Sequence, residues 1–145
     1  MGKNTGLVFA EIIGKFLGKN FKLGGVSDTG YDCLGITGRI CQLRGLDFPE
    51  KFKEWDIDSY AKLYRDDPNS AMDIAFDFFN SFAKKVDINR IVAGDILIME
   101  QPKEKIRFLA VYTGNRHAIT SFMRTGVSIF GINEANICIH AWRIE

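Results

Sequence analysis

Cysteine and histidine are scarce in this 145-residue chain, which contains three cysteines and two histidines. Structural zinc is held by closely spaced sets of four such ligands, and Cys33, Cys41 and Cys138 are far apart in the sequence, so we expect no metal site. The pair Gly24-Gly25 is not followed by the Gly-Lys-Ser/Thr sequence of a phosphate-binding loop. We therefore expect a protein without a metal or another cofactor.

The low and odd number of cysteines also argues against a disulfide framework. If Cys33 and Cys41 share one helix, they lie about 12 Å apart along its axis at ~1.5 Å per residue, which is too far for a disulfide. We expect a reducing environment in which at least one thiol is free.

A charge excess of either sign is lacking as well, because 19 Lys and Arg residues are matched by 18 Asp and Glu residues. Proteins that bind nucleic acid or anionic membranes typically carry a basic excess, so we expect neither partner. The apolar stretch over residues 7–17 contains Glu11 and Lys15, which a signal peptide or a membrane-spanning segment would avoid. These features predict a protein that is cytoplasmic as synthesised, and no pattern indicates its oligomeric state.

The first part of the chain has the hydrophobic spacing of helices. Apolar residues recur at a period near 3.6 over residues 5–17, 33–45 and about 70–84, with Thr5 as a plausible N-cap of the first. Asp67-Pro68-Asn69 provides a stop and a cap before the third helix. Residues 46–70 show no clear period, and we expect them to be irregular.

After residue 91 the hydrophobic period changes to two, which is typical of β-strands. The sequence contains no repeat and no linker, and its length suits one domain over residues 1–145. Helices over about 1–90, followed by strands over about 91–145, predict an α+β fold with an antiparallel sheet curled into a half-barrel. The five expected strands cover residues 96–99, 108–112, 118–122, 127–132 and 137–142.

Cys33 is the strongest candidate for a functional side chain. It begins a predicted helix after a glycine-rich loop, where unpaired N–H groups and the helix dipole stabilise a thiolate and can hold an oxyanion. Asp32 is a good N-cap that would fix the start of this helix. The alternative is a buried structural cysteine, because free cysteine is among the most buried residue types.

Two sequence blocks around Cys33 resemble a known family. Residues 16–25 (FLGKNFKLGG) and 30–35 (GYDCLG) are similar to the opening of the NlpC-type cell-wall cysteine peptidases. Later blocks of that family resemble residues 93–98 (AGDILI), 110–115 (AVYTGN) and 126–127 (GV), so only residues 46–90 are unmatched. The resemblance implies a papain-like domain in which Cys33 is the nucleophile that cleaves amide bonds in peptidoglycan stem peptides. The style is closest to members from phage and prophage tails.

The sequence departs from the family pattern at several polar positions. The catalytic histidine of the family falls on Phe108, its tyrosine before the glycine pair on Phe21, and its serine after the cysteine on Leu34. Only Thr120 or Ser121 is available for the third polar residue. Apolar side chains therefore replace polar ones at positions that the resemblance brings together.

A histidine elsewhere in the chain is the remaining candidate for a base. His117 follows a predicted turn at the far end of its strand from residue 108, and we interpret it as a surface residue. Alternation in the last strand places His140 on one face with Cys138 and Trp142. If that face meets the helix of Cys33, His140 can substitute as the base.

Two functions from different classes follow. The first is a peptidoglycan stem-peptide hydrolase-like protein with Cys33 as nucleophile and a peptidoglycan peptide, or a similar small peptide, as its partner. The second is an inactive relative that binds such peptides or serves as a structural component, for example in a phage tail. A third, less favoured, is an unrelated cysteine-dependent transferase. The expected substrate-contacting residues are Asp32, Phe21, Phe108 and Trp55. Trp55 belongs with Tyr60 and Tyr64 to a group that either stacks on substrate or covers the core.

Overall fold

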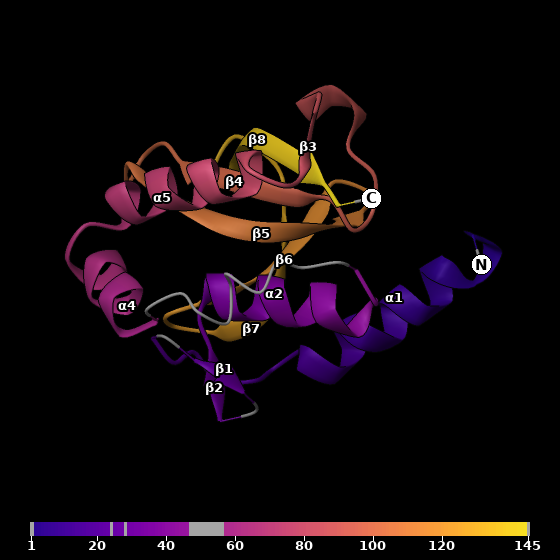
Figure 1. Cartoon of the computed structure of the whole chain (residues 1–145), viewed down its shortest axis with the longest axis horizontal. Helices are drawn as coiled ribbons and strands as arrows, with labels where there is room; N and C mark the ends of the chain where they lie inside the picture. Colours follow the sequence, from indigo (N-terminus) through magenta and orange to yellow (C-terminus); the bar gives the residue numbers. More distant parts are fainter. Residues whose placement is uncertain (1, 24, 28, 47–56, 145) are drawn as a thin grey trace.

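The computed structural model describes residues 2–23, 25–27, 29–46 and 57–144. Its helices, shown in Figure 1, are α1 (Gly2–Phe16), α2 (Cys33–Leu43), α4 (Ile57–Asp66), α5 (Pro68–Asn80) and the short 3₁₀ helix η1 (Ile88–Arg90). Its strands are β1 (Val26–Ser27), β2 (Gly30–Tyr31), β3 (Lys84–Val86), β4 (Ile96–Gln101), β5 (Ile106–Gly114), β6 (His117–Phe122), β7 (Gly126–Gly131) and β8 (Ile137–Arg143).

The strands confirm the predicted α+β class. Strands β3-β8-β4-β5-β6-β7 form one six-stranded sheet in that order, and each neighbouring pair is antiparallel. The five expected strands are β4 to β8. The sixth, β3, is a short edge strand that contains Lys84 and Lys85. Lysines at a sheet edge discourage pairing with other chains. They also interrupt the alternation of apolar residues by which a strand is recognised in the sequence. The small hairpin of β1 and β2 lies within the expected turn-rich loop.

The capping residues explain where the helices begin. Asp32 caps α2 by accepting a hydrogen bond from the Gly35 amide at 2.7 Å, and Asp67 caps α5 by accepting one from Ser70. Both caps were expected from the sequence. The prediction that Thr5 caps the first helix is wrong, since α1 begins at Gly2. The apolar period marks the buried turns only, and a helix can extend beyond them through polar residues.

The expectation that residues 46–70 are irregular is also wrong in its second half, where α4 runs from Ile57 to Asp66. Residues 47–56 lie outside the described part of the chain. The helix was missed because it is short and polar on average, although its apolar residues have the spacing of one helix face.

Helices α5 and α2 cover different parts of one face of the sheet. The register aligns Trp142, Ile96, Val111 and Ile119 in a row across β8, β4, β5 and β6, and directly paired side chains point to the same face. At one end of this row, Trp142 contacts Phe79 of α5. At the other, Val111 and Ile119 share an apolar cluster with Ile36 and Ile40 of α2. Figure 1 shows the same arrangement, with α5 near β4 and β8 and α2 near β6 and β7.

Burial of this face accounts for much of the stability. Trp142, Phe79, Ile36, Ile40 and Ile119 are all essentially inaccessible to solvent. Each such side chain contributes roughly 1.5–3 kcal/mol relative to full exposure. The sheet therefore provides a rigid platform on which α2 is held by its own apolar stripe.

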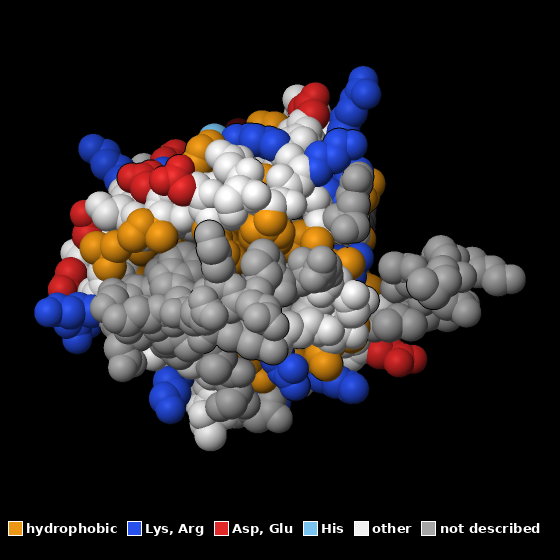
Figure 2. Space-filling view, viewed as in Figure 1, with side chains coloured by type: hydrophobic (Ala, Val, Ile, Leu, Met, Phe, Trp, Pro, Cys, Tyr) orange, Lys and Arg blue, Asp and Glu red, His pale blue; other side chains and the backbone are white. Residues whose placement is uncertain are grey.

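The surface carries both signs of charge. Figure 2 shows Lys and Arg side chains interspersed with Asp and Glu over the described part of one face. Among the described residues, no helix is long and apolar enough to cross a bilayer.

Candidate functional site

Cys33 is the first residue of α2 and is 1% exposed. The chain reaches it through β2, and the Asp32 amide donates to the carbonyl of Gly25 at 3.4 Å. Gly35 is required here because a Cβ atom at this position would fall onto that same Gly25 carbonyl oxygen. The glycine-rich loop therefore packs directly against the first turn of α2.

The first turn of α2 gives the thiol a defined electrostatic environment. Asp32, which is buried, accepts from Gly35, and the Thr37 hydroxyl donates to the Cys33 carbonyl at 2.8 Å. A sulfur at this position lies at the positive end of the helix dipole, which favours the thiolate. Cys33 thus begins the helix and Asp32 caps it, both as the sequence predicted.

Tyr64 of α4 is the side chain that the structure adds to this site. Its side chain lies close enough to Cys33 and Asp32 for their charges to affect its ionisation. Burial raises the pKa of Tyr64 well above its ordinary value, and the negative charges of Cys33 and Asp32 raise it further. Tyr64 also packs against the core cluster that contains Cys33 and Leu34, and Figure 1 shows α4 near the end of α2 that follows β2.

From the sequence, Tyr64 was expected only to belong to an aromatic group, with Trp55 and Tyr60, that either stacks on substrate or covers the core. A signal for its position existed, because Tyr60, Leu63 and Tyr64 are spaced as one face of a helix. That spacing indicates a short amphipathic helix with two tyrosines on its apolar side. It does not indicate which core residue such a tyrosine would meet.

Phe21 lies in a segment that runs beside β2. It forms an isolated parallel bridge with Tyr31, two residues before Cys33, and its side chain is half-buried. The amide of Lys22 donates to the Tyr31 carbonyl, and the amide of Tyr31 donates to the Asn20 carbonyl. The structure thus brings the backbone of Phe21 close to the start of α2, as the motif order suggested.

Phe108 is buried in an aromatic cluster. Its ring centroid lies 5.5 Å from that of Phe122 and 5.5 Å from that of Phe130. The register pairs Phe108 with Met99, and this pair alternates with the row that faces the helices. Phe108 therefore points to the face of the sheet away from α2. Trp55 lies outside the described residues.

The two hydroxyl residues considered for the third polar position are both bonded to backbone carbonyls. Thr120 Oγ1 donates to Leu109 at 2.6 Å, and Ser121 Oγ donates to Tyr31 at 2.6 Å. Ser121 therefore ties β6 to β2 just before Cys33. Each hydroxyl therefore uses its single proton in a hydrogen bond to the backbone.

His140 lies on β8, on the sheet face that the helices cover. Its Nδ1 is 3.0 Å from Lys85 Nζ, and its ring centroid is 4.7 Å from that of Phe76 on α5. Burial lowers the pKa of His140, and the charges of Lys85 and then Arg107 lower it further. Its recorded partners therefore come from α5, β3 and β8.

The strand order separates His140 from the helix of Cys33. Helix α2 packs on β5 and β6, whereas β4 lies between β8 and β5. Strands are spaced ~4.8 Å apart, so β8 and β5 are about 10 Å from each other. A β-bulge between Ile98 and Met99 also changes the expected alternation, because His140 pairs with Ile98 while Cys138 pairs with Met99. Cys138 and His140 therefore occupy opposite faces, contrary to the sequence prediction.

The remaining histidine, His117, and the other two thiols, Cys41 and Cys138, differ from Cys33 in their environments. His117 is exposed at the start of β6, and its Nδ1 lies 2.7 Å from the Asn115 carbonyl oxygen. Burial raises the pKa of Cys41 to about 12 and that of Cys138 to about 11. These two thiols stay protonated at neutral pH. Within the described ranges, no group of three or more His, Cys, Asp or Glu side chains could hold a metal ion.

Three solved structures are similar to this fold over nearly the whole chain. An NlpC/P60 family protein from Bacillus cereus matches 96% of the chain at 22% identity with a TM-score of 0.64, although the match spans only 40% of that protein's chain. The NlpC/p60 domain of the peptidoglycan hydrolase SagA matches 96% of the chain, and 98% of its own, at 18% identity with a TM-score of 0.61. A protein from Staphylococcus aureus described as similar to lipoprotein, NLP/P60 family, matches 97% of the chain and 41% of its own at 15% identity with a TM-score of 0.61.

These likenesses establish the fold, which is the papain-like NlpC type expected from the sequence. The comparison with curated proteins found no significant match. The sequence model of the NlpC/P60 family matches residues 18–144, a range that begins before the Phe21 segment and ends one residue after β8. The chain therefore belongs to the NlpC/P60 family.

Proposed function

We propose that the protein cleaves amide bonds in peptidoglycan stem peptides, with Cys33 as the nucleophile. The observation that carries this proposal is the position of Cys33 at the start of α2, where Asp32 fixes the first turn. Family membership and the likeness to a domain of a peptidoglycan hydrolase support the substrate class.

The chemistry would follow from the thiolate at the helix terminus. The Cys33 sulfur attacks the amide carbonyl, and N–H groups at the start of α2 stabilise the oxyanion. The leaving amine takes a proton as the C–N bond breaks, and water then hydrolyses the thioester and regenerates the thiol. Each step uses only the thiol, water and a proton donor.

The substrate-contacting residues remain proposals. Phe21 is the best placed of them, because its segment runs beside β2. Asp32 acts through the helix start that it caps. Phe108 is the least well placed of them, because its ring packs with Phe122 and Phe130 on the sheet face away from α2. Trp55 is proposed from the sequence alone.

A second candidate is a protein that binds such peptides without cleaving them, for example as a structural component of a phage or prophage tail. The location of the two histidines favours it. His140 contacts Lys85 and Phe76, and His117 contacts the Asn115 carbonyl. An efficient cysteine peptidase uses an imidazole beside its thiol, and losing such a partner slows catalysis by several orders of magnitude.

Turnover and binding of defined muropeptides separate the two candidates. The first predicts slow release of new amino groups by the native chain and none by Cys33→Ala. The second predicts saturable binding with no release by either. The surroundings of His140 predict that His140→Ala retains any turnover, and a complete loss in a folded His140→Ala variant would instead assign it as the base.

A further inference from the structure

Ser121 of β6 connects the sheet to the chain segment just before Cys33. Its Oγ donates a hydrogen bond of 2.6 Å to the carbonyl oxygen of Tyr31, two residues before Cys33. Ser121 is 4% exposed and Tyr31 is 1% exposed, so solvent has little access to this bond. The two residues are 90 positions apart in the sequence, and only the tertiary fold brings them together.

The hydroxyl of Ser121 lies on an otherwise apolar face of β6. Side chains alternate along a strand, so Ser121 points to the same face as Ile119, which shares an apolar cluster with Ile36 of α2. Val127, which pairs with Ser121 from β7, belongs to that cluster as well. A hydroxyl in such a place is costly unless it is hydrogen-bonded. Its bond goes to the segment that leads into α2.

The other contacts of Tyr31 come from the N-terminal part of the chain. Its amide donates to the Asn20 carbonyl at 3.0 Å, and its carbonyl also accepts from the Lys22 amide at 3.1 Å. Its ring meets that of Phe16 edge-on, with the centroids 5.4 Å apart. A carbonyl oxygen can accept two hydrogen bonds, and Lys22 and Ser121 supply one each. Of these two donors, only Ser121 belongs to the six-stranded sheet.

We propose that Ser121 is a positioning residue for Cys33, because its bond to the Tyr31 carbonyl fixes the start of α2 relative to the sheet. Apolar packing is non-directional, so it holds α2 on the sheet without setting the exact place of its first residue. A hydrogen bond has a defined length and direction and does set it. The inference rests on the proposed nucleophilic role of Cys33. Ser121 acts through the backbone and without contact with the substrate.

The test compares Ser121→Ala with Thr120→Val. Thr120 is the neighbour of Ser121 on β6, is also buried and also donates to a carbonyl at 2.6 Å, but its acceptor is Leu109 on β5. Each variant therefore removes one buried hydroxyl. Amide hydrogen exchange, followed by NMR, measures local opening residue by residue. The Cβ chemical shift of Cys33 reports the geometry of the nucleophile, and thermal melting measures the overall stability of each variant.

In Ser121→Ala, we expect the amides of Tyr31 and Gly35 to exchange about three- to tenfold faster relative to those of β4 and β8, as loss of one buried hydrogen bond implies. The Cβ shift of Cys33 should move as well. Thr120→Val should leave both amides and the Cys33 shift at their native values, whatever its melting temperature. Native exchange and a native Cys33 shift in Ser121→Ala, or equal changes in the two variants, would overturn the proposal.

Kinetics on muropeptides separate positioning from binding. If the native chain releases amino groups, Ser121→Ala should lower kcat by about tenfold or more and leave KM nearly unchanged, since a misplaced sulfur attacks poorly while the peptide contacts are kept. A loss that appears only in KM would make Ser121 a binding residue and overturn the proposal. A native chain without turnover refutes the proposed hydrolysis instead, and the exchange rates and the Cys33 shift then decide on Ser121 by themselves.

A measurement on the native chain covers the case in which Ser121→Ala does not fold. The buried Ser121 hydroxyl proton should give its own NMR signal, with a nuclear Overhauser effect to the Lys22 amide proton, because both protons point to the Tyr31 carbonyl oxygen. A Ser121 hydroxyl that exchanges with water as fast as that of an exposed serine would refute the bond, and with it the positioning role.

Discussion

Arg143 holds the buried carboxylate of Asp95 through a pair of hydrogen bonds. Its Nε donates to Oδ1 at 2.8 Å, and its Nη2 donates to Oδ2 at 2.9 Å. Asp95 is 1% exposed and also accepts from the Val92 amide at 2.8 Å. The pair joins the end of β8 to the residue that precedes β4, and thus ties together one end of these two neighbouring strands.

Removal of this carboxylate should destabilise the fold strongly. Asp95→Ala removes one acceptor of the Arg143 guanidinium and the acceptor of the Val92 amide, and loss of one partner of a buried ion pair costs about 3–5 kcal/mol. Because the Arg143 side chain is 34% exposed, we expect the lower end of that range. Urea unfolding measures the change. Asp66→Ala is the matched control, since Asp66 pairs with Arg65 on the exposed surface and should change stability by less than about 1 kcal/mol. Equal losses in the two variants would contradict this account.

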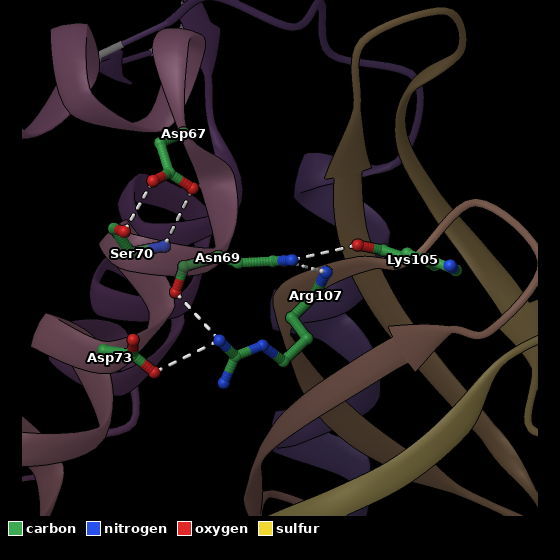
Figure 3. A network of polar contacts seen from close by, with 6 residues as sticks. All are labelled: Asp67, Asn69, Ser70, Asp73, Lys105 and Arg107. Atoms are coloured by element: carbon green, nitrogen blue, oxygen red, sulfur yellow. Dashed lines mark hydrogen bonds and ion pairs between the residues drawn. The ribbon is translucent and has the colours of Figure 1, made fainter.

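Asn69 fastens the start of α5 to the β4–β5 hairpin. Its Oδ1 accepts from the Arg107 amide at 3.0 Å, and its Nδ2 donates to the Lys105 carbonyl at 2.9 Å, as Figure 3 shows. Asn69→Ala removes both bonds and leaves a partly buried amide unsatisfied, so we expect a loss of about 1–3 kcal/mol in the free energy of unfolding.

Asp73 provides the control for Asn69. It also contacts Arg107, at 3.1 Å, but its side chain is 68% exposed, so Asp73→Ala should cost less than about 1 kcal/mol. Chemical denaturation of both variants tests the difference. A larger loss for Asp73→Ala than for Asn69→Ala would show that the ion pair, and not the amide clamp, holds α5 to the hairpin.

The acid sensitivity of the fold should include a contribution from His140. Burial and the charges of Lys85 and Arg107 lower its pKa below the ordinary value of 6.5. The unfolded chain therefore binds this proton at a higher pH than the folded chain, and stability falls as the pH drops from about 6.5 toward the folded pKa. Above that window His140 is neutral in both states and contributes nothing.

A His140→Gln variant isolates this effect. Its urea midpoint should depend less on pH than that of the native chain between neutral pH and about one unit below the ordinary histidine pKa. Asp67, whose pKa is lowered by its bonds to Ser70, titrates at much lower pH and does not interfere. Parallel pH profiles for the two proteins would show that His140 ionises alike in both states.

The fold was predictable from the sequence where hydrophobic period and capping agree. Asp32 and Asp67 each cap a helix with a buried stripe, as expected, although α5 covers Pro68–Asn80 where the sequence predicted about 70–84. The alternating runs gave five of the strands because each buries one face in a packed layer. Hydrophobic period and helix caps depend on neighbouring residues in the sequence, so they can be recognised without knowledge of tertiary contacts.

The missed features depend on tertiary contacts or on irregular geometry. Strand β3 carries Lys84 and Lys85, and only its pairing with β8 makes it a strand. The bulge that separates Cys138 from His140 leaves no mark in an alternating sequence. Tyr64 of α4 packs against the core cluster that contains Cys33 of α2, and nothing in either segment specifies the other. The position of Cys33 was therefore predictable from the sequence, while the packing of Tyr64 against the same cluster was not.

Substitution of Gly35 should disrupt the helix turn that contains Cys33. A Cβ atom there would collide with the carbonyl oxygen of Gly25, which is backbone and cannot rotate away. Gly35→Ala should push the glycine-rich loop off α2 and lower the melting temperature substantially, because overpacking of a tight contact typically costs 1–3 kcal/mol or more.

Gly14 is the control because the opposite result is expected for the same substitution. It lies in α1, and a Cβ atom there would have nothing within 4 Å. Gly14→Ala should therefore stabilise the chain by about 0.5–1 kcal/mol, since alanine loses less backbone entropy than glycine in a helix. If Gly35→Ala instead melts at or above the native temperature, the loop does not press on the first turn of α2, and Cys33 is not held in place by that contact.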